Sequence, residues 1–260
     1  MTVAVPKLTL ERRLLREHTL VIACDEVGRG ALAGPVAVGA VAVDAPRARR
    51  RVPEGLRDSK LVAAHHRPAV AERAAAWVQA SAVGWSSAAE IDEVGIIRAL
   101  GLAALRAIAE LRAFGVVPED AIVLLDGNHD YITPAGGTGL RVQPVIKADR
   151  DCASAAAASV LAKVARDDLM VGLHDEAPAY QWARNKGYAS AEHRAAIRSH
   201  GLSPHHRASW AIADAPTLLP SRWITAISSV NPSGPGPISP VAPCANKVGA
   251  PVTHSTVCLR

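Results

Sequence analysis

The chain has 260 residues, of which 49% are hydrophobic and only 3% aromatic, and 29 lysines and arginines against 24 acidic residues give it a net charge of +5. The length suits one domain of roughly 200 residues with an appendage, and the positive charge suits a polyanionic partner. The segment before Leu20 is charged and lacks a signal sequence, no apolar run reaches the ~20 residues of a membrane span, and the four cysteines form no CxxC pair. We therefore expect a cytoplasmic monomer that makes no membrane contact.

Composition divides the chain into three parts. Residues 1–19 are a polar, basic lead-in, residues 20–211 alternate apolar and amphipathic segments as a folded domain does, and residues 212–260 are rich in Pro, Ser and Gly. A tail of this composition is predicted to be disordered.

Periodicity within 20–211 predicts the order of strands and helices. Strands are expected at 20–24, 36–43, 80–85, 121–126 and 141–147, the last at a sheet edge or with a bulge because it contains Pro144. Helices are expected at 64–79, at 95–114 and from 152 to about 173, and a separate short helix is expected to end near residue 199. This order indicates an α/β layered domain with a mixed sheet. The residues expected on the buried face of the helix at 95–114 are Ile97, Leu100, Ala104, Ile108 and Leu111.

Several local patterns predict caps and packing positions. Ser87 to Glu90 carry a capping-box signature. Ser59 could cap a helix that begins near residue 63. Cys24 and Cys152 lie in apolar surroundings and are expected to be reduced packing residues.

Three separate apolar segments end in carboxylates, namely Asp25 with Glu26, Asp126 and Asp149. In an α/β sheet, strand ends from distant positions converge on one edge. Four carboxylates there would repel one another unless cations neutralised them, and hard oxygen ligands without Cys or His point to Mg²⁺ or Mn²⁺. Two such ions suit in-line displacement at a phosphodiester.

The first carboxylate pair raises a geometric difficulty. Adjacent residues of a strand point to opposite faces, so Asp25 and Glu26 share a site only if the strand ends or twists there, which the glycines at 28 and 30 favour. The alternative is a solvated pair at a Gly-rich turn. Asp151 competes with Asp149 for the fourth position, but it directly precedes the long helix and is predicted to be its N-cap.

Short motifs then follow one another in a fixed order. They are Asp25-Glu26-Val-Gly28-Arg29-Gly30, Asp58-Ser59-Lys60, Asp126-Gly127, Lys147-Ala-Asp149 before the Ala-rich helix with Lys163 and Arg166-Asp167, Gly187-Tyr188 with His193, and His206-Arg207-Ala-Ser-Trp210. This series resembles bacterial ribonuclease HII over roughly residues 20–210. The resemblance implies an RNase H-like fold, with a mixed central sheet flanked by helices and a small C-terminal helical segment.

The resemblance also implies an activity and a set of site residues. The expected enzyme is an endoribonuclease that hydrolyses the RNA strand of RNA–DNA hybrids and cuts 5′ of ribonucleotides embedded in duplex DNA, leaving a 3′-hydroxyl and a 5′-phosphate. Its nucleic-acid partners would be these hybrids and duplexes. The four catalytic acids, which would hold two Mn²⁺ or Mg²⁺ ions, are Asp25, Glu26, Asp126 and Asp149.

Five further residues are implied to bind substrate. Gly28, Arg29 and Gly30 would read the 2′-hydroxyl and the neighbouring phosphate, the 2′-hydroxyl being what distinguishes RNA from DNA. Tyr188 would pack on the sugar that follows the ribonucleotide, and Lys60 would contact a phosphate. One departure from the family pattern is Ala148, which stands where glycine is usual and could shift the approach to Asp149.

Structural roles remain open for several of these residues. Tyr188 could be a half-buried aromatic residue beside a turn, and Arg166-Asp167 reads as a pair on a helix surface. Three histidines, His193, His205 and His206, could shuttle protons or contact phosphate, although solvated loop histidines are commoner.

Two other functions compete with the ribonuclease HII-like activity. A nucleic-acid-binding module with a dead site predicts at least one substituted acid, whereas all four are present. The ribonuclease HIII subtype usually carries an added N-terminal domain, and only 19 residues precede the first strand here.

Overall fold

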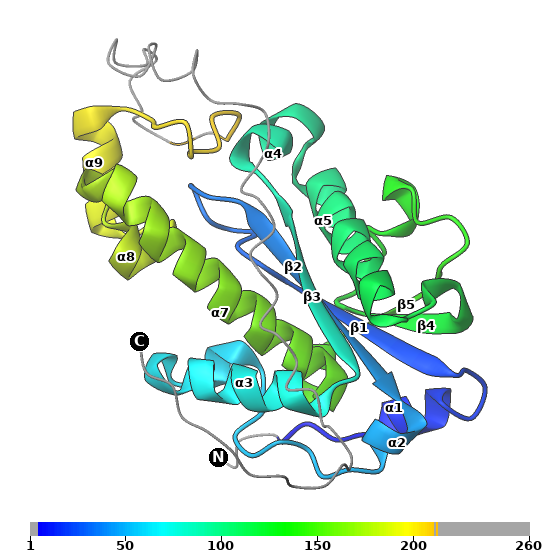
Figure 1. The fold of residues 1–260 in the computed structure, drawn as a ribbon. Helices are drawn as coiled ribbons and strands as arrows, with labels where there is room; N and C mark the ends of the chain where they lie inside the picture. The colour runs from blue at the N-terminus through cyan, green and yellow to red at the C-terminus, as the bar shows by residue number, and fades with distance from the viewer. Residues whose placement is uncertain (1–4, 211, 213–260) are drawn as a thin grey trace, which may run out of the picture. The chain divides into compact units, whose positions relative to one another are not determined.

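The computed structural model describes residues 5–210 and residue 212, which lie within one unit of the chain. The predicted disordered tail therefore falls, apart from Ile212, outside the described residues. Five strands form a single mixed sheet in the order β3-β2-β1-β4-β5 (Figure 1). The strands are β1 Leu20–Val27, β2 Val36–Asp44, β3 Ala80–Ser86, β4 Ala121–Asp126 and β5 Arg141–Val145. β1, β2 and β3 are antiparallel neighbours, whereas β1, β4 and β5 run parallel.

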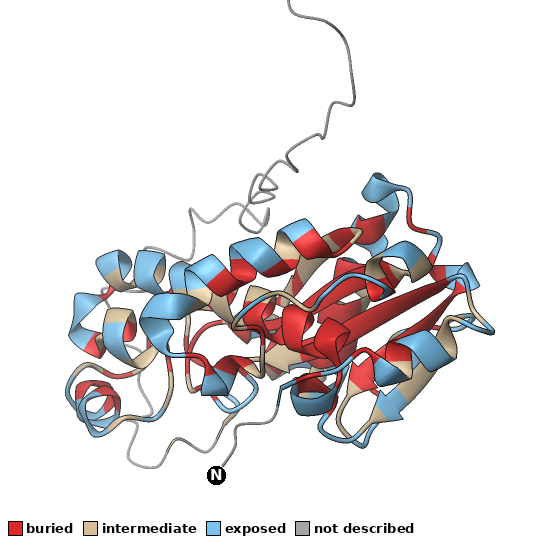
Figure 2. Cartoon of the chain, turned by 90° about the horizontal axis from the view of Figure 1, so that it is seen from below, coloured by how far each residue is buried: buried red, intermediate tan, exposed pale blue. Residues whose placement is uncertain are grey.

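Helices cover both faces of this sheet. The helices are α1 Thr9–Leu14, α2 Ala45–Ala48, α3 Arg67–Trp77, α4 Ala88–Val94, α5 Ile96–Leu111, α6 Ala148–Asp151, α7 Ala153–Glu176, α8 Trp182–Asn185 and α9 Ala191–His200. One apolar core lies between the sheet and α7 with α3, and a second lies between the sheet and α5. Figure 2 shows the buried strands between helices whose outer faces are exposed. The layered α/β architecture predicted from the sequence is thus confirmed.

Small residues bring α7 close to the sheet. The first half of the helix is an alanine run, and every alanine from 155 to 158 is fully buried. On the facing strand, a Cβ built at Gly39 would lie 2.4 Å from the carbonyl oxygen of Ala158. The alanines and Gly39 therefore let the helix backbone approach the sheet closely, which fixes the height of α7 above the predicted site.

A third, smaller apolar cluster joins the C-terminal end of α7 to α8 and α9. Tyr180 and Trp182 stack at its centre with ring centroids 5.3 Å apart, and Met170 and Ile197 are buried against them. This cluster is the predicted small C-terminal helical segment. Among the described residues, no helix has the length and apolarity that crossing a bilayer requires.

Most of the predicted elements are confirmed. β5 is the edge strand that Pro144 predicted, and Ser87 and Glu90 form a reciprocal capping box at α4. The expected buried face of α5 is correct except at Ile97, which is 39% exposed in the first turn of the helix. Helix α1 lies inside the segment expected to be only a polar lead-in, and its Leu8 N-cap and Glu11 are buried.

The cap predictions at Ser59 and Asp151 were wrong. Asp58 is the residue that caps the 3₁₀ turn Ser59–Leu61, while Ser59 is buried and accepts a hydrogen bond from Ser159. Asp151 belongs to the one-turn helix α6 and pairs with Arg150, so Cys152 takes the N-cap position of α7.

The N-terminus of α7 is capped by a residue distant in sequence. Glu11 Oε1 accepts hydrogen bonds from the backbone nitrogen and the hydroxyl of Ser154, at 2.9 and 2.8 Å. The orphan N–H groups and the helix dipole favour a carboxylate at this position and partly offset burial, which raises the pKa of Glu11 above its usual value. The segment predicted as a lead-in therefore stabilises the helix that covers the candidate site.

Candidate active site

The four predicted catalytic acids come from three neighbouring elements at one end of the sheet. β1 pairs with β4 only as far as Cys24, opposite Leu125, and then continues against β2 up to Val27. Asp25 and Glu26 therefore lie on the part of β1 that extends past this pairing, next to Asp126 at the last position of β4. Helix α6 supplies Asp149, whose backbone N–H donates a 3.2 Å hydrogen bond to Asp126 Oδ1.

The prediction that the first strand ends at residue 24 was wrong, since β1 includes both carboxylates. Strand alternation then assigns them to different faces. Asp25 continues the row that packs toward α7, where the hydroxyl of Ser159 partly offsets the rise in its pKa. Glu26 continues the other row, where its Oε2 accepts a 3.2 Å hydrogen bond from the hydroxyl of Tyr131.

The carboxylates on the α7 side are electrostatically strained. Burial, followed by repulsion from Asp126, raises the pKa of Asp25 well above its usual value of 3.8, and Glu26 and Asp149 raise it further. Burial is also the main cause of the raised pKa values of Asp126 and Asp149. Carboxyl groups that resist ionisation because they are buried close to one another are a frequent mark of a functional site.

Lys60 lies at the rim of this cluster. Its ammonium nitrogen is 3.6 Å from Asp149 Oδ2 and 3.9 Å from Asp58 Oδ1, and its side chain is 78% exposed. Asp58 orients the turn by accepting a hydrogen bond from the backbone nitrogen of Lys60. The lysine predicted to contact phosphate thus sits beside the acids with its charge accessible to solvent.

The predicted substrate loop begins immediately after Glu26. Gly28 has φ +85°, and a Cβ there would collide with the side chain of Arg166. Gly30 has open space around its Cα, and Arg29 extends outward with its guanidinium 3.6 Å from Glu26 Oε1. The first glycine is therefore required by the fold, whereas the second leaves room beside the loop.

Tyr188 is partly buried beside a turn, as the structural alternative predicted, and its ring lies against Arg166. The guanidinium carbon of Arg166 lies 5.4 Å from the centroid of its ring. Its backbone carbonyl accepts a hydrogen bond from His193 Nδ1. The ring position is thus fixed by a cation–π contact and by its own backbone.

The sequence reading of Arg166 and of two histidines was wrong. Arg166 is fully buried and donates to the carbonyls of Ala33, Pro35 and Lys186 instead of pairing with its neighbour Asp167. His193, on α9, and His206 are also buried, with their Nε2 atoms 3.0 Å apart and their rings against that of Trp182. Both pack against Tyr180 of the third apolar cluster and are not solvated.

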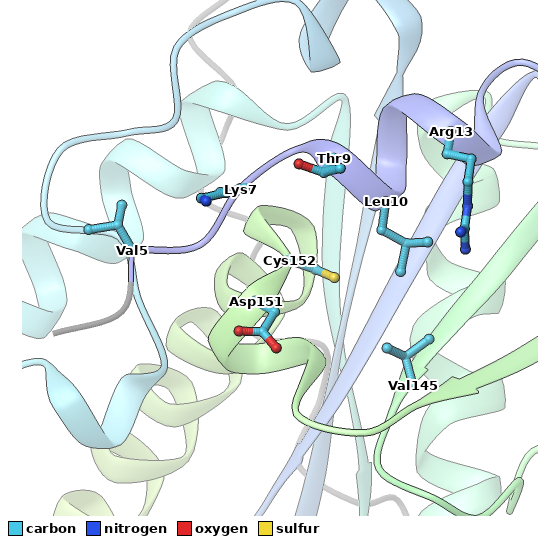
Figure 3. A pocket seen from close by; sticks show the side chains of 8 residues that line it. All are labelled: Val5, Lys7, Thr9, Leu10, Arg13, Val145, Asp151 and Cys152. Atoms are coloured by element: carbon cyan, nitrogen blue, oxygen red, sulfur yellow. The ribbon is translucent and has the colours of Figure 1, made fainter. Parts of the chain in front are cut away.

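Across residues 5–210 and 212, no three His, Cys, Asp or Glu side chains are grouped closely enough to hold one ion. A cavity of about 600 Å³ lies elsewhere, between the N-terminal segment and α6 (Figure 3). None of the nine predicted site residues lines it; its lining is Val5, Lys7, Thr9, Leu10, Arg13, Val145, Asp151 and Cys152.

The sheet order and the helices on its two faces define the class of protein. Solved structures with the same fold include the ribonuclease H2 of Pyrococcus horikoshii, with a TM-score of 0.58 and 22% identity over 75% of this chain and 95% of that one. Bst-RNase HIII in complex with Mn²⁺ also matches, with a TM-score of 0.58 and 21% identity over 70% of this chain and 61% of that one. The chain therefore has the RNase H-like fold.

Sequence comparison assigns the family. The family model described as ribonuclease HII matches residues 22–213. The ribonuclease HII of Streptomyces avermitilis is 46% identical over 81% of this chain and 85% of its own length. That of Paracoccus denitrificans is 43% identical, over 79% of this chain and 92% of its own length. The chain belongs to the ribonuclease HII family and is a ribonuclease H, as its motifs indicated.

Proposed function

We propose that this ribonuclease H cuts the RNA strand of RNA–DNA hybrids, and cuts 5′ of single ribonucleotides in duplex DNA, with Asp25, Glu26, Asp126 and Asp149 as its catalytic acids. The observation that carries the proposal is the gathering of carboxyl groups at the end of the sheet, where burial first, and then repulsion from neighbouring acids, raises the pKa of Asp25, Asp126 and Asp149. A cluster that is costly to ionise is maintained most simply by a bound cation.

The chemistry of these donors fits a hard divalent ion. They offer carboxylate oxygens with no thiol or imidazole among them, which is the ligand set of Mg²⁺ and Mn²⁺. The ligands would be the four acids, whose side chains would have to close around the ions. Asp126 and Asp149 are already joined through a backbone hydrogen bond, and the charge of Glu26, although it continues the other row of β1, acts on both Asp25 and Asp126. Two ions bound there would supply positive charge to the attacking water and to the leaving 3′ oxygen.

The residues around the acids orient the substrate in this proposal. The backbone at Gly28–Gly30 approaches the ribose, because Gly30 has no neighbouring heavy atom within 4 Å of a Cβ position. Tyr188 presents its ring to the next sugar, and Lys60 offers a charge to the phosphate near Asp149. A 2′-hydroxyl in contact with the loop would distinguish a ribonucleotide from its DNA neighbours.

The test is cleavage of a labelled DNA duplex that carries one ribonucleotide, with Mn²⁺ or Mg²⁺ and with EDTA. We expect one metal-dependent cut on the 5′ side of the ribonucleotide, abolished in Asp126→Asn. The matched control is Asp151→Asn, since Asp151 is two residues from Asp149 but is exposed and paired with Arg150. Equal cutting of an all-DNA duplex, or full activity in Asp126→Asn, would contradict the proposal.

A further inference from the structure

Arg207 lies behind the Gly28–Gly30 loop, on the side away from solvent. It is fully buried, in the segment that follows α9. Its Nη2 donates to the carbonyl of Gly28 at 2.6 Å and its Nη1 to the carbonyl of Arg29 at 2.8 Å. Nε and Nη2 also reach the carbonyl of Gly34, at 3.3 and 3.2 Å. One guanidinium therefore binds three carbonyls of a single loop.

This arrangement decides which way the loop presents its amides. Two consecutive carbonyls, at Gly28 and Arg29, point inward to the guanidinium. Within the described residues, no hydrogen bond uses the backbone N–H of Arg29 or Gly30. Inward carbonyls with unused N–H groups next to them form the kind of concavity that binds an anion or a hydroxyl oxygen.

Within the described residues, no carboxylate forms an ion pair with Arg207. Burial next to Arg166 lowers the pKa of Arg207 to about 9. Its guanidinium carbon lies 4.8 Å from the centroid of the Trp210 ring. A buried cation directly behind a loop adds positive potential on the outer side, where a phosphate would lie.

The segment that carries Arg207 is fixed at both ends. On one side, His206 Nε2 lies 3.0 Å from His193 Nε2, and His193 Nδ1 bonds to the Tyr188 carbonyl. On the other side, Asp92 of α4 accepts hydrogen bonds from the backbone nitrogens of Ala208 and Ser209, at 2.8 and 3.0 Å. The loop and the tyrosine proposed to read the substrate are thus joined through one rigid segment.

We propose that Arg207 is a positioning residue for ribonucleotide recognition, which orders the Gly28–Gly30 loop so that its amides face the substrate, and that Asp92 supports it by anchoring the following segment. The inference rests on the proposed function of the loop. Lysine cannot replace this arginine, because a single ammonium group lacks the planar fork that reaches several carbonyls at once.

The experiment measures steady-state cleavage of the one-ribonucleotide duplex in Mn²⁺, with the matching all-DNA duplex as competitor. The ratio of the competitor Ki to the substrate KM reports the preference for the ribonucleotide. For Arg207→Lys we expect KM to rise and this ratio to fall about tenfold, equivalent to ~1.4 kcal/mol of binding free energy, with the competitor Ki unchanged. A merely structural role would instead reduce the active fraction, lowering kcat at constant KM.

A second variant keeps the test informative if Arg207→Lys folds poorly. Asp92→Ala leaves the loop contacts intact and removes only the anchor of residues 208 and 209, so a smaller fall in the same ratio is expected. Glu93→Ala is the control, since this neighbouring side chain is exposed and makes no hydrogen bond or ion pair in the described part of the chain.

The outcomes distinguish the proposed function of the Gly28–Gly30 loop from the positioning role of Arg207. A wild-type ratio near one overturns the proposed function of the loop, and this inference with it. A wild-type preference that Arg207→Lys and Asp92→Ala both retain overturns the positioning role and leaves the proposed function standing.

Discussion

The hydroxyl of Tyr131 donates a hydrogen bond to Glu26 across 3.2 Å, from a position 105 residues further along the chain. Tyr131 is 4% exposed and packs in the core beneath α5. Burial and the nearby negative charge of Glu26 raise the pKa of its phenol well above 10, so it remains a donor at any working pH. Glu26 is thereby oriented from the face of the sheet opposite to Asp25.

Removal of this donor tests whether the orientation of Glu26 matters for catalysis. Tyr131→Phe keeps the ring and leaves Glu26 Oε2 without the bond, so we expect kcat to fall several-fold, in line with the ~1 kcal/mol of an ordinary hydrogen bond. Tyr180→Phe is the control, because it removes the hydroxyl that donates to the Gly201 carbonyl in the third apolar cluster. Similar losses of Tm in both variants, with lower kcat in both, would contradict a specific role for Tyr131.

Neutralising Asp25 is expected to stabilise the metal-free protein. Folding raises the pKa of Asp25 above 3.8, so the folded protein keeps a proton that the unfolded chain releases. Its contribution to stability is therefore full below about pH 3.8 and is lost as the pH rises toward the folded-state value. In EDTA, Asp25→Asn should have a higher Tm than wild type, by about 2–4 °C for each kcal/mol saved by not burying a charge beside the other acids.

The pH dependence provides the check on this prediction. The Tm difference should be small in acid, grow as the pH is raised, and shrink when Mn²⁺ is added to the wild type. Asp151→Asn should show no such gain, because pairing with Arg150 lowers the pKa of that carboxyl. A lower Tm for Asp25→Asn at neutral pH in EDTA would show that the charge of Asp25 does not destabilise the metal-free protein.

Close packing of α7 on the sheet should make Gly39 intolerant of any side chain. The Cβ of Gly39→Ala would lie 2.4 Å from the backbone oxygen of Ala158, and backbone cannot rotate away. We expect a loss of about 1–3 kcal/mol, as in other overpacked cores. Gly172→Ala on the exposed side of the same helix has open space and should gain about 0.5–1 kcal/mol. Thermal unfolding of both variants decides the point; equal stability would disprove the tight contact.

The elements and the acids were predictable because their signals are local. Each acid follows an apolar run in its own segment, and β4 ends in Asp126 where the pattern placed it, whereas β5 ends at Val145 and Asp149 lies in the one-turn helix α6 that follows. The end of the first strand was wrongly predicted at Cys24 because pairing with β2, which local composition does not show, extends β1 to Val27, two residues beyond Asp25. Ile97 was misjudged because helical periodicity does not show where a helix leaves the core.

The supporting residues were not predictable for a different reason. Glu11 caps a helix 143 residues away, and Arg207 binds a loop 179 residues away. Neither contact leaves a pattern in its own segment. A buried arginine or histidine has the same local appearance as a solvated one, so Arg166 and His206 were assigned to the surface. Only the tertiary structure distinguishes the two cases.

The buried histidine pair should make the protein sensitive to acid. His206 Nδ1 accepts a hydrogen bond from the backbone nitrogen of Ser203, and its Nε2 faces His193, so the network requires a neutral ring. Burial is the main reason that the pKa of His206 falls from 6.5 to about 3, and it also lowers that of His193. The unfolded chain therefore binds more protons than the folded one between these pH values.

Stability from His206 is thus fully present above about pH 6.5 and is lost as the pH falls toward 3. The slope should be about 1.4 kcal/mol per pH unit for one such group. His206→Asn should be less stable at pH 7 yet lose less stability between pH 6.5 and 4.5, as measured by urea unfolding. His129→Gln, at an exposed loop position, should keep the wild-type slope. If His206→Asn retained that slope as well, the acid sensitivity would have to arise from other groups.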